Sequence, residues 1–191
     1  MLLYNNSRSG NCYKVRLLAA LLEELDVLDR SNRPEVLGDL NPALRVPVLV
    51  LDDGRHLAES NAIIDYLAEG TQYLPQDPYT RAQVLSWQFF EQYEHEPNIA
   101  VARFLNLFGV DASEEFHKRL HAGGTKALEA LERGLEGREF LVGDSYSVAD
   151  ISLYAYTHVA DEGGFDLSPY PAIRSWLTRV AAQPGHIPIT A

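Results

Sequence analysis

The chain has 191 residues, of which 46% are hydrophobic, and a formal net charge of −11, so it can build the core of one domain or two small ones. Because it is acidic and has no run of Lys or Arg, we expect no nucleic-acid partner. It has no apolar stretch of membrane-spanning length, no signal-peptide pattern and a single cysteine, which lead us to expect a cytoplasmic protein without membrane contact or disulfide framework.

The first part of the chain, to about Leu74, alternates strand and helix patterns, which suggests a small α/β layer. Ser9 or Asn11 is expected to cap the first helix, because both side chains accept hydrogen bonds from first-turn N–H groups. Residues 52–54 (Asp-Asp-Gly) have the composition of a hairpin turn. In chain order we expect a strand at 2–4, a helix to about 22, a strand at 24–28, an apolar strand at 47–52, a return strand at 55–58 and a helix from 59.

Residues 74–78 contain two prolines and resemble a linker, and the chain after them follows a helical pattern. We therefore place a first domain at residues 1–74 and an all-helical domain at residues 79–191. Pro97 is expected to interrupt a long helix. The expected helices are 79–108, 116–135 (weakened by Gly123 and Gly124), one that follows the capping signal of Ser147 and Asp150, and 171–182.

Ser9 is the leading candidate for chemistry. A hydroxyl at a strand-to-helix turn lies near the positive end of a helix, where an anion such as a thiolate is stabilised. A single serine is more often a plain cap or turn residue. Cys12 is the second candidate, because a thiol pKa can fall at a helix start, although a buried small hydrophobic residue is the ordinary alternative.

Two further segments could bind a peptide-like ligand. If the Val46–Pro47 bond is cis, the N–H and C=O of Val46 are exposed at the edge of the sheet and can pair with an extended peptide; the alternative is an ordinary trans proline that opens a strand. Ser60 and the first-turn N–H groups can bind a carboxylate, and Glu59 an ammonium group. The alternative is a plain helix start. The six histidines lack the spacing of metal motifs, so we expect no metal site.

Taken together, four stretches in this order resemble the cytosolic glutathione transferases of bacterial, serine type, similar to zeta-, theta- and phi-like members. The resemblance covers nearly the whole chain and favours the cis form of Pro47. The stretches are 9–16 (Ser-Gly-Asn-Cys-Tyr-Lys-Val-Arg), 41–49 (Asn-Pro-Ala-Leu-Arg-Val-Pro-Val-Leu), 57–63 (Leu-Ala-Glu-Ser-Asn-Ala-Ile) and 140–150, which begins Phe-Leu-Val-Gly-Asp.

The resemblance implies an α/β thioredoxin-like N-terminal domain, an all-α helical-bundle C-terminal domain and a homodimer. Glutathione would be the co-substrate, conjugated through its thiolate to a small hydrophobic electrophile in detoxification, without a metal. Ser9 would activate the thiol. The implied glutathione contacts are Ser9, Asn11, Arg45, Val46, Pro47, Glu59 and Ser60, and the possible second-substrate pocket residues are Cys12, Tyr93, His95 and Arg103; for Arg103 an ion pair within the helical domain is the competing explanation.

Two alternatives to conjugation remain open at this point. One is a glutathione-dependent disulfide reductase or lyase that uses Cys12, and the other is a non-catalytic domain for glutathione binding or partner assembly. Two departures from the family pattern are visible. The segment before Glu24 is shorter by about six residues, as if residues were missing after Glu23, and Leu44 stands where the family often has Gly.

Overall fold

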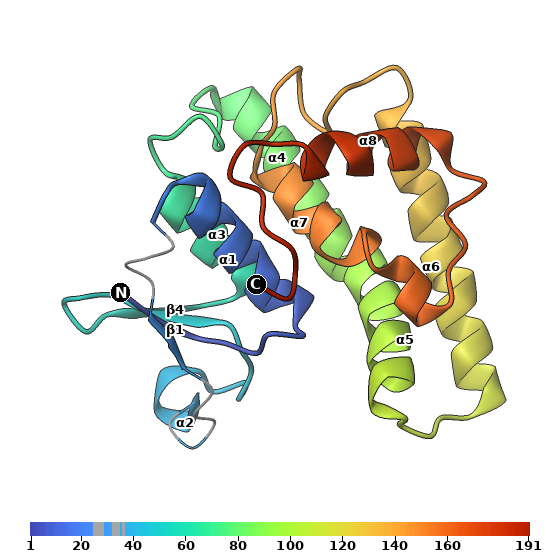
Figure 1. The fold of residues 1–191 in the computed structure, drawn as a ribbon, viewed down its shortest axis with the longest axis horizontal. Helices are drawn as coiled ribbons and strands as arrows, with labels where there is room; N and C mark the ends of the chain where they lie inside the picture. The colour runs from blue at the N-terminus through green and yellow to red at the C-terminus, as the bar shows by residue number, and fades with distance from the viewer. Residues whose placement is uncertain (25–28, 32–34, 36) are drawn as a thin grey trace. The chain divides into compact units, whose positions relative to one another are not determined.

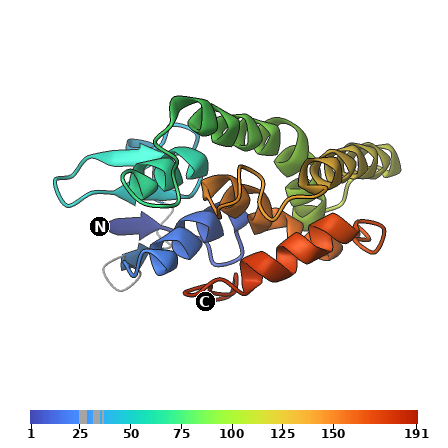
Figure 2. The same ribbon diagram turned by 90° about the horizontal axis from the view of Figure 1, so that it is seen from above.

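The computed structural model describes residues 1–24, 29–31, 35 and 37–191. Its chain divides into two compact units, residues 1–74 together with 183–191, and residues 75–182. The last nine residues therefore belong to the first unit, whereas the sequence-based assignment placed them in the helical domain. They lie beside the first helix (Figures 1 and 2), because Tyr13 Oη donates to the carbonyl of Ile187 at 2.7 Å and Arg16 Nη2 donates to that of Ile189 at 2.8 Å.

A four-stranded sheet of order β2-β1-β3-β4 forms the centre of the first unit. Strand β1 (Leu2–Tyr4) runs parallel to β2 (Asp29–Ser31) and antiparallel to β3 (Val48–Val50). The last pair, β3 with β4 (His56–Ala58), is an antiparallel hairpin. Gly54, at a φ of 86°, lies in its turn, so the predicted Asp-Asp-Gly turn is confirmed.

The connection from β1 to β2 is longer than the sequence suggested. The strand expected at 24–28 falls mostly on residues 25–28, which lie outside the described residues, and the described strand begins at Asp29. The chain leaves the first helix at Leu22, and Glu23 then turns it with a φ of 58°. The described parts of this crossover are therefore α1 with its end at Leu22 to Glu24, and the strand from Asp29.

Helices α1 (Gly10–Leu21) and α3 (Ser60–Ala68) lie side by side against one face of the sheet, and the short α2 (Leu37–Leu40) lies on the other (Figure 1). Successive side chains of each strand point to opposite faces of the sheet, so residues two apart lie on the same face. Leu3 and Leu49 have no exposed surface. Their neighbours on the opposite face pack with α2; this second cluster contains Leu2, Tyr4, Leu37, Leu40, Val46, Val48 and Val50.

The described part of the second unit is all helical. Pro97 lies in the first turn of α5, immediately after a π-helical turn, so the predicted interruption is confirmed. A proline has no N–H to donate, and a wider turn before it is one way to accommodate the lost bond. The helices are α4 (Pro78–Phe90), the π-helix η3 (Glu91–His95), α5 (Glu96–Phe108), α6 (Glu114–Leu135), α7 (Val148–Thr157), the 3₁₀ turn η4 (Ala160–Gly163) and α8 (Pro171–Ala181).

Gly123 and Gly124 weaken α6 by propensity but are required by packing. A Cβ atom at Gly123 would overlap the side-chain amide of Asn98, and one at Gly124 would overlap the ring of Phe165. The two glycines therefore let the neighbouring segments approach α6 closely, and this gain in packing offsets their low helix propensity.

Asp150 organises the start of α7 as a buried cap. Its carboxylate accepts hydrogen bonds from the N–H of Leu141 and the N–H of Ser147, each at 3.0 Å, from Ser147 Oγ at 3.1 Å and from Trp176 Nε1 at 2.9 Å. Ser147 Oγ also accepts from the N–H of Ala149, so the predicted capping box is confirmed. Burial raises the pKa of Asp150 to about 6 against the effect of these four donors.

The fold class predicted from the sequence, an α/β thioredoxin-like unit followed by an all-α unit, is confirmed. Among the residues that the structure describes, no helix has both the length and the apolar character needed to cross a bilayer.

Candidate active site

Three segments that are far apart in the sequence leave the sheet at the same end. In the strand register, Tyr4 at the end of β1 is opposite Val48 at the start of β3, and Val48 is opposite Ala58 at the end of β4. The turn after Tyr4, the segment before Val48 and the segment after Ala58 therefore meet at one edge. Because these segments carry Ser9, Val46-Pro47 and Glu59-Ser60, the fold brings most of the predicted glutathione contacts to one edge of the first unit.

Ser9 is the N-cap of α1 and is half-buried. Its Oγ accepts a hydrogen bond from the N–H of Cys12 at 3.3 Å, and its own N–H donates to the carbonyl of Asn6 at 3.0 Å. A hydroxyl has one hydrogen to donate, and for Ser9 the partner within the described part of the chain is the thiol of Cys12, whose pKa this contact lowers. The Ser9 O–H thus lies beside the positive end of a helix, where its partner is a weak acceptor that a ligand anion could replace.

Cys12 is fully buried in the first turn of α1. Its Sγ accepts a hydrogen bond from the N–H of Asn6 at 3.3 Å. Burial raises the pKa of the Cys12 thiol, and this effect exceeds the opposing effects of Asn6, Ser9 and Arg16. A thiol in this environment stays neutral at physiological pH and is a poor nucleophile.

Ser60 begins α3 and joins it to α1 through a buried polar contact. Ser60 is 4% exposed, and its Oγ donates to Asn11 Oδ1 at 3.2 Å. It also accepts a hydrogen bond from Lys14 Nζ at 3.3 Å, although Lys14 has no exposed surface. The predicted contacts Asn11 and Ser60 are therefore neighbours, and Lys14 joins them.

Glu59 precedes this helix with an uncommon backbone conformation. Its φ is 69° and its ψ is 115°, and its side chain makes no capping hydrogen bond. A non-glycine residue with positive φ is rare and is concentrated at functional sites, where the surrounding structure holds the strain. The exposed side chain of Glu59 is consistent with a role in ligand binding.

The Val46–Pro47 peptide bond is cis, as expected. The loop before it is held by Asn41, whose Nδ2 donates to the carbonyl of Arg45 at 2.9 Å and whose Oδ1 accepts from the N–H of Ala43 at 3.0 Å. Leu44 adopts a φ of 55° with its side chain exposed. The turn therefore keeps the left-handed conformation that glycine favours, although the residue is leucine.

The candidate second-substrate residues of the helical unit differ in their surroundings. Tyr93 is 78% exposed, whereas His95, two residues later in the same π-helical turn, has no exposed surface and its Nε2 lies 2.9 Å from Thr157 Oγ1. The side chain of Arg103 is buried and forms an ion pair with Glu162 at 2.6 Å. The ion-pair explanation for Arg103 is thus borne out, and His95 contributes to packing within the unit.

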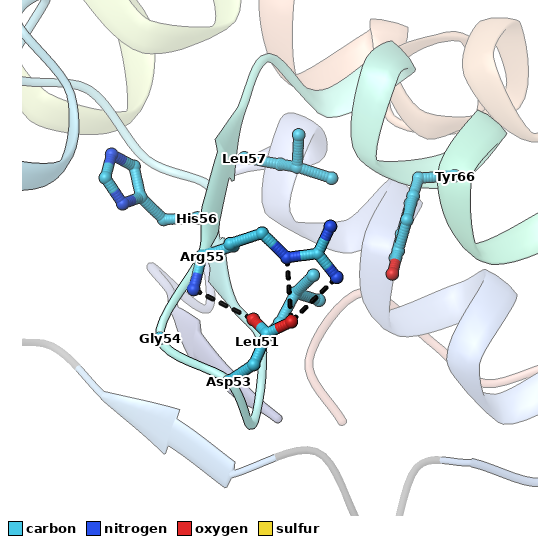
Figure 3. A pocket seen from close by; sticks show the side chains of 7 residues that line it. All are labelled: Leu51, Asp53, Gly54, Arg55, His56, Leu57 and Tyr66. Atoms are coloured by element: carbon cyan, nitrogen blue, oxygen red, sulfur yellow. Dashed lines mark hydrogen bonds and ion pairs between the residues drawn. The ribbon is translucent and has the colours of Figure 1, made fainter.

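A surface hollow of about 590 Å³ lies on the first unit at the β3–β4 hairpin (Figure 3). Arg55 crosses it between Asp53, with which it forms an ion pair at 2.7 Å, and the ring of Tyr66. None of the predicted glutathione contacts lines this hollow. Its lining residues are Leu51, Asp53, Gly54, Arg55, His56, Leu57 and Tyr66.

Sequence reasoning missed Lys14, Asn41 and Arg16. The signal for the two cations was present, because each lies within the apolar run of α1, where a charged side chain needs a buried partner. Arg16 donates to the carbonyls of Ser7 and Ile189 and to that of Ala191. Nothing in the local pattern could have identified the carbonyls of Ile189 and Ala191, because they come from the distant end of the chain.

Comparison with known proteins identifies the family. The model of the glutathione S-transferase N-terminal domain matches residues 8–69, and that of the glutathione S-transferase C-terminal domain matches residues 92–184. A crystal structure of a glutathione S-transferase from Pseudomonas fluorescens (Pf-5) is 48% identical, with a TM-score of 0.94 over 100% of this chain and 98% of that one. The chain therefore belongs to the glutathione S-transferase family, and the predicted enzyme class is confirmed.

Relatives within this family carry different names. Maleylacetoacetate isomerase from Mus musculus is 30% identical over 90% of this chain and 83% of its own length. Disulfide-bond oxidoreductase YfcG from Escherichia coli (strain K12) is 29% identical over 80% of this chain and 74% of its own length. Family membership therefore does not select among these reactions.

Proposed function

We propose that the protein conjugates the thiolate of glutathione to small hydrophobic electrophiles and that Ser9 is the catalytic residue. The observation that carries this proposal is the position of the Ser9 hydroxyl at the start of α1, where its oxygen accepts from the N–H of Cys12 and its hydrogen meets the neutral Cys12 thiol, a weak acceptor. A thiolate placed beside Ser9 would receive that hydrogen bond and the field of the helix terminus.

The lowering of the glutathione thiol pKa that this proposal requires is modest. A free thiol has a pKa of about 8.5, so only a few per cent of it is ionised at neutral pH. Each unit by which the pKa falls corresponds to about 1.4 kcal/mol of preference for the thiolate. One charge-assisted hydrogen bond and a helix terminus supply that amount. The thiol proton would pass to solvent when the thiolate forms. The sulfur would then form a bond to the electrophilic carbon, and the carbon–halogen bond of an aryl halide would break with release of halide.

The remaining predicted contacts would orient the tripeptide. The backbone of Val46 would pair with the cysteinyl part beside Pro47, and Arg45 would face the glycyl carboxylate. Ser60 and Asn11 would hold the γ-glutamyl carboxylate, and Glu59 would accept from its ammonium group. The support for these roles is their common position at the sheet edge and the strained backbone of Glu59. Such positioning accelerates reaction by holding the sulfur near the electrophile.

The surroundings of Cys12 favour conjugation over disulfide reduction or lyase chemistry through Cys12. That chemistry needs an accessible thiol of low pKa, whereas Cys12 is fully buried and its pKa is raised. The common position of the predicted glutathione contacts at one sheet edge supports glutathione binding, and we rank a non-catalytic domain for glutathione binding or partner assembly below conjugation. We expect a two-fold dimer, as the resemblance implies.

Steady-state kinetics with glutathione and an aryl halide test the proposal. Ser9→Ala should lower kcat/KM by about 100-fold, the typical effect of removing one such donor, and Cys12→Ala should change it by less than about threefold. An inactive Cys12→Ala with an unaffected Ser9→Ala would assign the chemistry to Cys12. A wild-type protein that binds glutathione in calorimetry without turnover, or that does not bind it, would support the non-catalytic alternative. Maleylacetoacetate should be assayed in parallel, because one relative is named for it.

A further inference from the structure

Lys14 is the most unusual charged residue of the first unit. It lies in the first helix with no exposed surface, whereas lysines are almost never fully buried. Its ammonium group donates to Ser60 Oγ at 3.3 Å across the α1–α3 contact. The buried ammonium group of Lys14 therefore lies next to the hydroxyl of Ser60, the first residue of α3.

This contact fixes what the Ser60 hydroxyl can do. An ammonium group has three donors and no acceptor, so Ser60 Oγ must be the acceptor toward Lys14. Its single hydrogen is then directed elsewhere, and the observed acceptor is Asn11 Oδ1 at 3.2 Å. A ligand carboxylate that replaced or shared that acceptor would receive the hydroxyl hydrogen while Lys14 held the oxygen in place.

The position of the charge adds a second effect. A carboxylate oxygen bonded to Ser60 Oγ would lie at most about 6 Å from Lys14 Nζ, given a hydrogen bond of ordinary length. At that separation in a buried site the attraction between unit charges is weakly screened. The partial positive charge at the start of α3 acts in the same direction.

We propose that Lys14 is a positioning residue that orients Ser60 and makes the site selective for a γ-glutamyl group that carries a carboxylate. This inference rests on the proposed function, because it assumes that glutathione binds at Ser60. Lys14 does not touch the ligand; it acts through the Ser60 hydroxyl and through its charge.

The selectivity is measured with a matched pair of ligands. Calorimetry compares glutathione with γ-aminobutyryl-cysteinyl-glycine, which lacks the α-carboxylate of the glutamyl group and keeps its ammonium group. The wild-type protein should prefer glutathione by about tenfold or more, the effect of losing one charge-assisted hydrogen bond. Lys14→Met should reduce that preference below about threefold, and Lys14→Arg should restore most of it, because the charge and the donors return.

Arg16→Met is the matched control. Arg16 is also a fully buried cation of α1, but its hydrogen bonds go to the carbonyls of Ser7, Ile189 and Ala191 and not to Ser60. It should retain the wild-type preference. A loss of preference in Arg16→Met as large as that in Lys14→Met would show a general disturbance of α1 and would overturn the proposal.

If Lys14→Met does not fold, the wild-type protein provides the test through the nitrogen-15 resonance of Lys14 Nζ, assigned by its absence in Lys14→Arg. Glutathione should shift this resonance and γ-aminobutyryl-cysteinyl-glycine should leave it within error of the free protein. Equal shifts with both ligands, or none with either, would overturn the inference.

The two proposals fail in different ways. A wild-type protein that binds neither ligand contradicts the proposed function and the inference with it. A wild-type protein that binds glutathione selectively, with the same selectivity in Lys14→Met, contradicts the role of Lys14 alone.

Discussion

The starts of α1 and α7 use the same serine cap with opposite outcomes. Ser147 Oγ accepts from the N–H of Ala149 and donates to Asp150, so its hydrogen-bonding groups are used within the protein. Ser9 Oγ accepts from the N–H of Cys12, and its hydrogen meets the neutral thiol of Cys12, which is a weak acceptor. A cap whose hydroxyl donates to a carboxylate of the protein stabilises the fold, whereas a cap whose hydroxyl meets only a weak acceptor can donate to a ligand anion.

Removing the buried Asp150 cap at the start of α7 should have the largest effect on stability. Asp150→Ala removes the acceptor for the N–H of Leu141, the N–H and hydroxyl of Ser147 and Trp176 Nε1. Because these donors are buried and would be left unpaired, we expect a loss of about 4 kcal/mol in the free energy of unfolding. Urea denaturation measures it, and a loss below about 1 kcal/mol would contradict the role of this cap. Any correctly folded fraction should keep its affinity for glutathione.

The pH dependence of stability sharpens the same comparison. In the folded protein the pKa of Asp150 is raised from 3.8 to about 6. The stabilising contribution of this raised pKa is therefore complete below pH 4, where Asp150 is protonated in both the folded and the unfolded protein. It is lost as the pH rises from about 4 to 6, because the unfolded chain ionises first. The loss is about 3 kcal/mol at most. The stability difference between wild type and Asp150→Asn should therefore change with pH over this interval, and a constant difference would contradict the raised pKa.

The two cap serines provide a direct contrast. Ser147→Ala should lower the free energy of unfolding by about 2 kcal/mol, because it removes a buried cap with two hydrogen bonds. Ser9→Ala should lower it by about 1 kcal/mol, because the cap bond that is lost lies at a half-buried position. Calorimetric melting of both variants makes this comparison. A larger loss for Ser9→Ala would mean that Ser9 is chiefly a structural residue.

The smallest effect is expected at Cys12. Its thiol is buried and its pKa is raised, so alkylation by iodoacetamide at neutral pH should be slower than that of a free thiol by about tenfold or more. The rate of mass change in the native protein, with denatured protein as the control, measures this. Alkylation as fast as in the denatured control would contradict this prediction and show that the Cys12 thiol is reactive in the native protein.

Patterns of local chemistry were sufficient to predict much of this fold. The hairpin at Gly54, the interruption at Pro97 and the capping box of Ser147 and Asp150 each follow from one residue's backbone or hydrogen-bonding properties. The position of the second strand was less predictable, because a three-residue strand in a polar segment has little pattern. The helical glycines of α6 were judged by propensity, whereas packing against Phe165 decides their presence.

The candidate site was predicted in its parts but not in its connections. Ser9, Pro47 and Ser60 were identified from motifs, and the strand register then explains why they meet. Lys14 and Arg16 were not identified, because their partners come from α3 and from residues 183–191. A sequence pattern indicates that a buried cation needs a partner, and the tertiary fold determines which partner it has.

The pKa of the glutathione thiol in its complex with the protein tests the central claim most directly. It is obtained from the ultraviolet absorbance of the thiolate against pH, for the wild-type protein, Ser9→Ala and Cys12→Ala. We predict that the wild-type protein and Cys12→Ala lower this pKa by about one unit or more from about 8.5, and that Ser9→Ala returns it close to that value. An equally lowered pKa in Ser9→Ala would contradict the claim that the Ser9 hydroxyl at the start of α1 stabilises the sulfur anion.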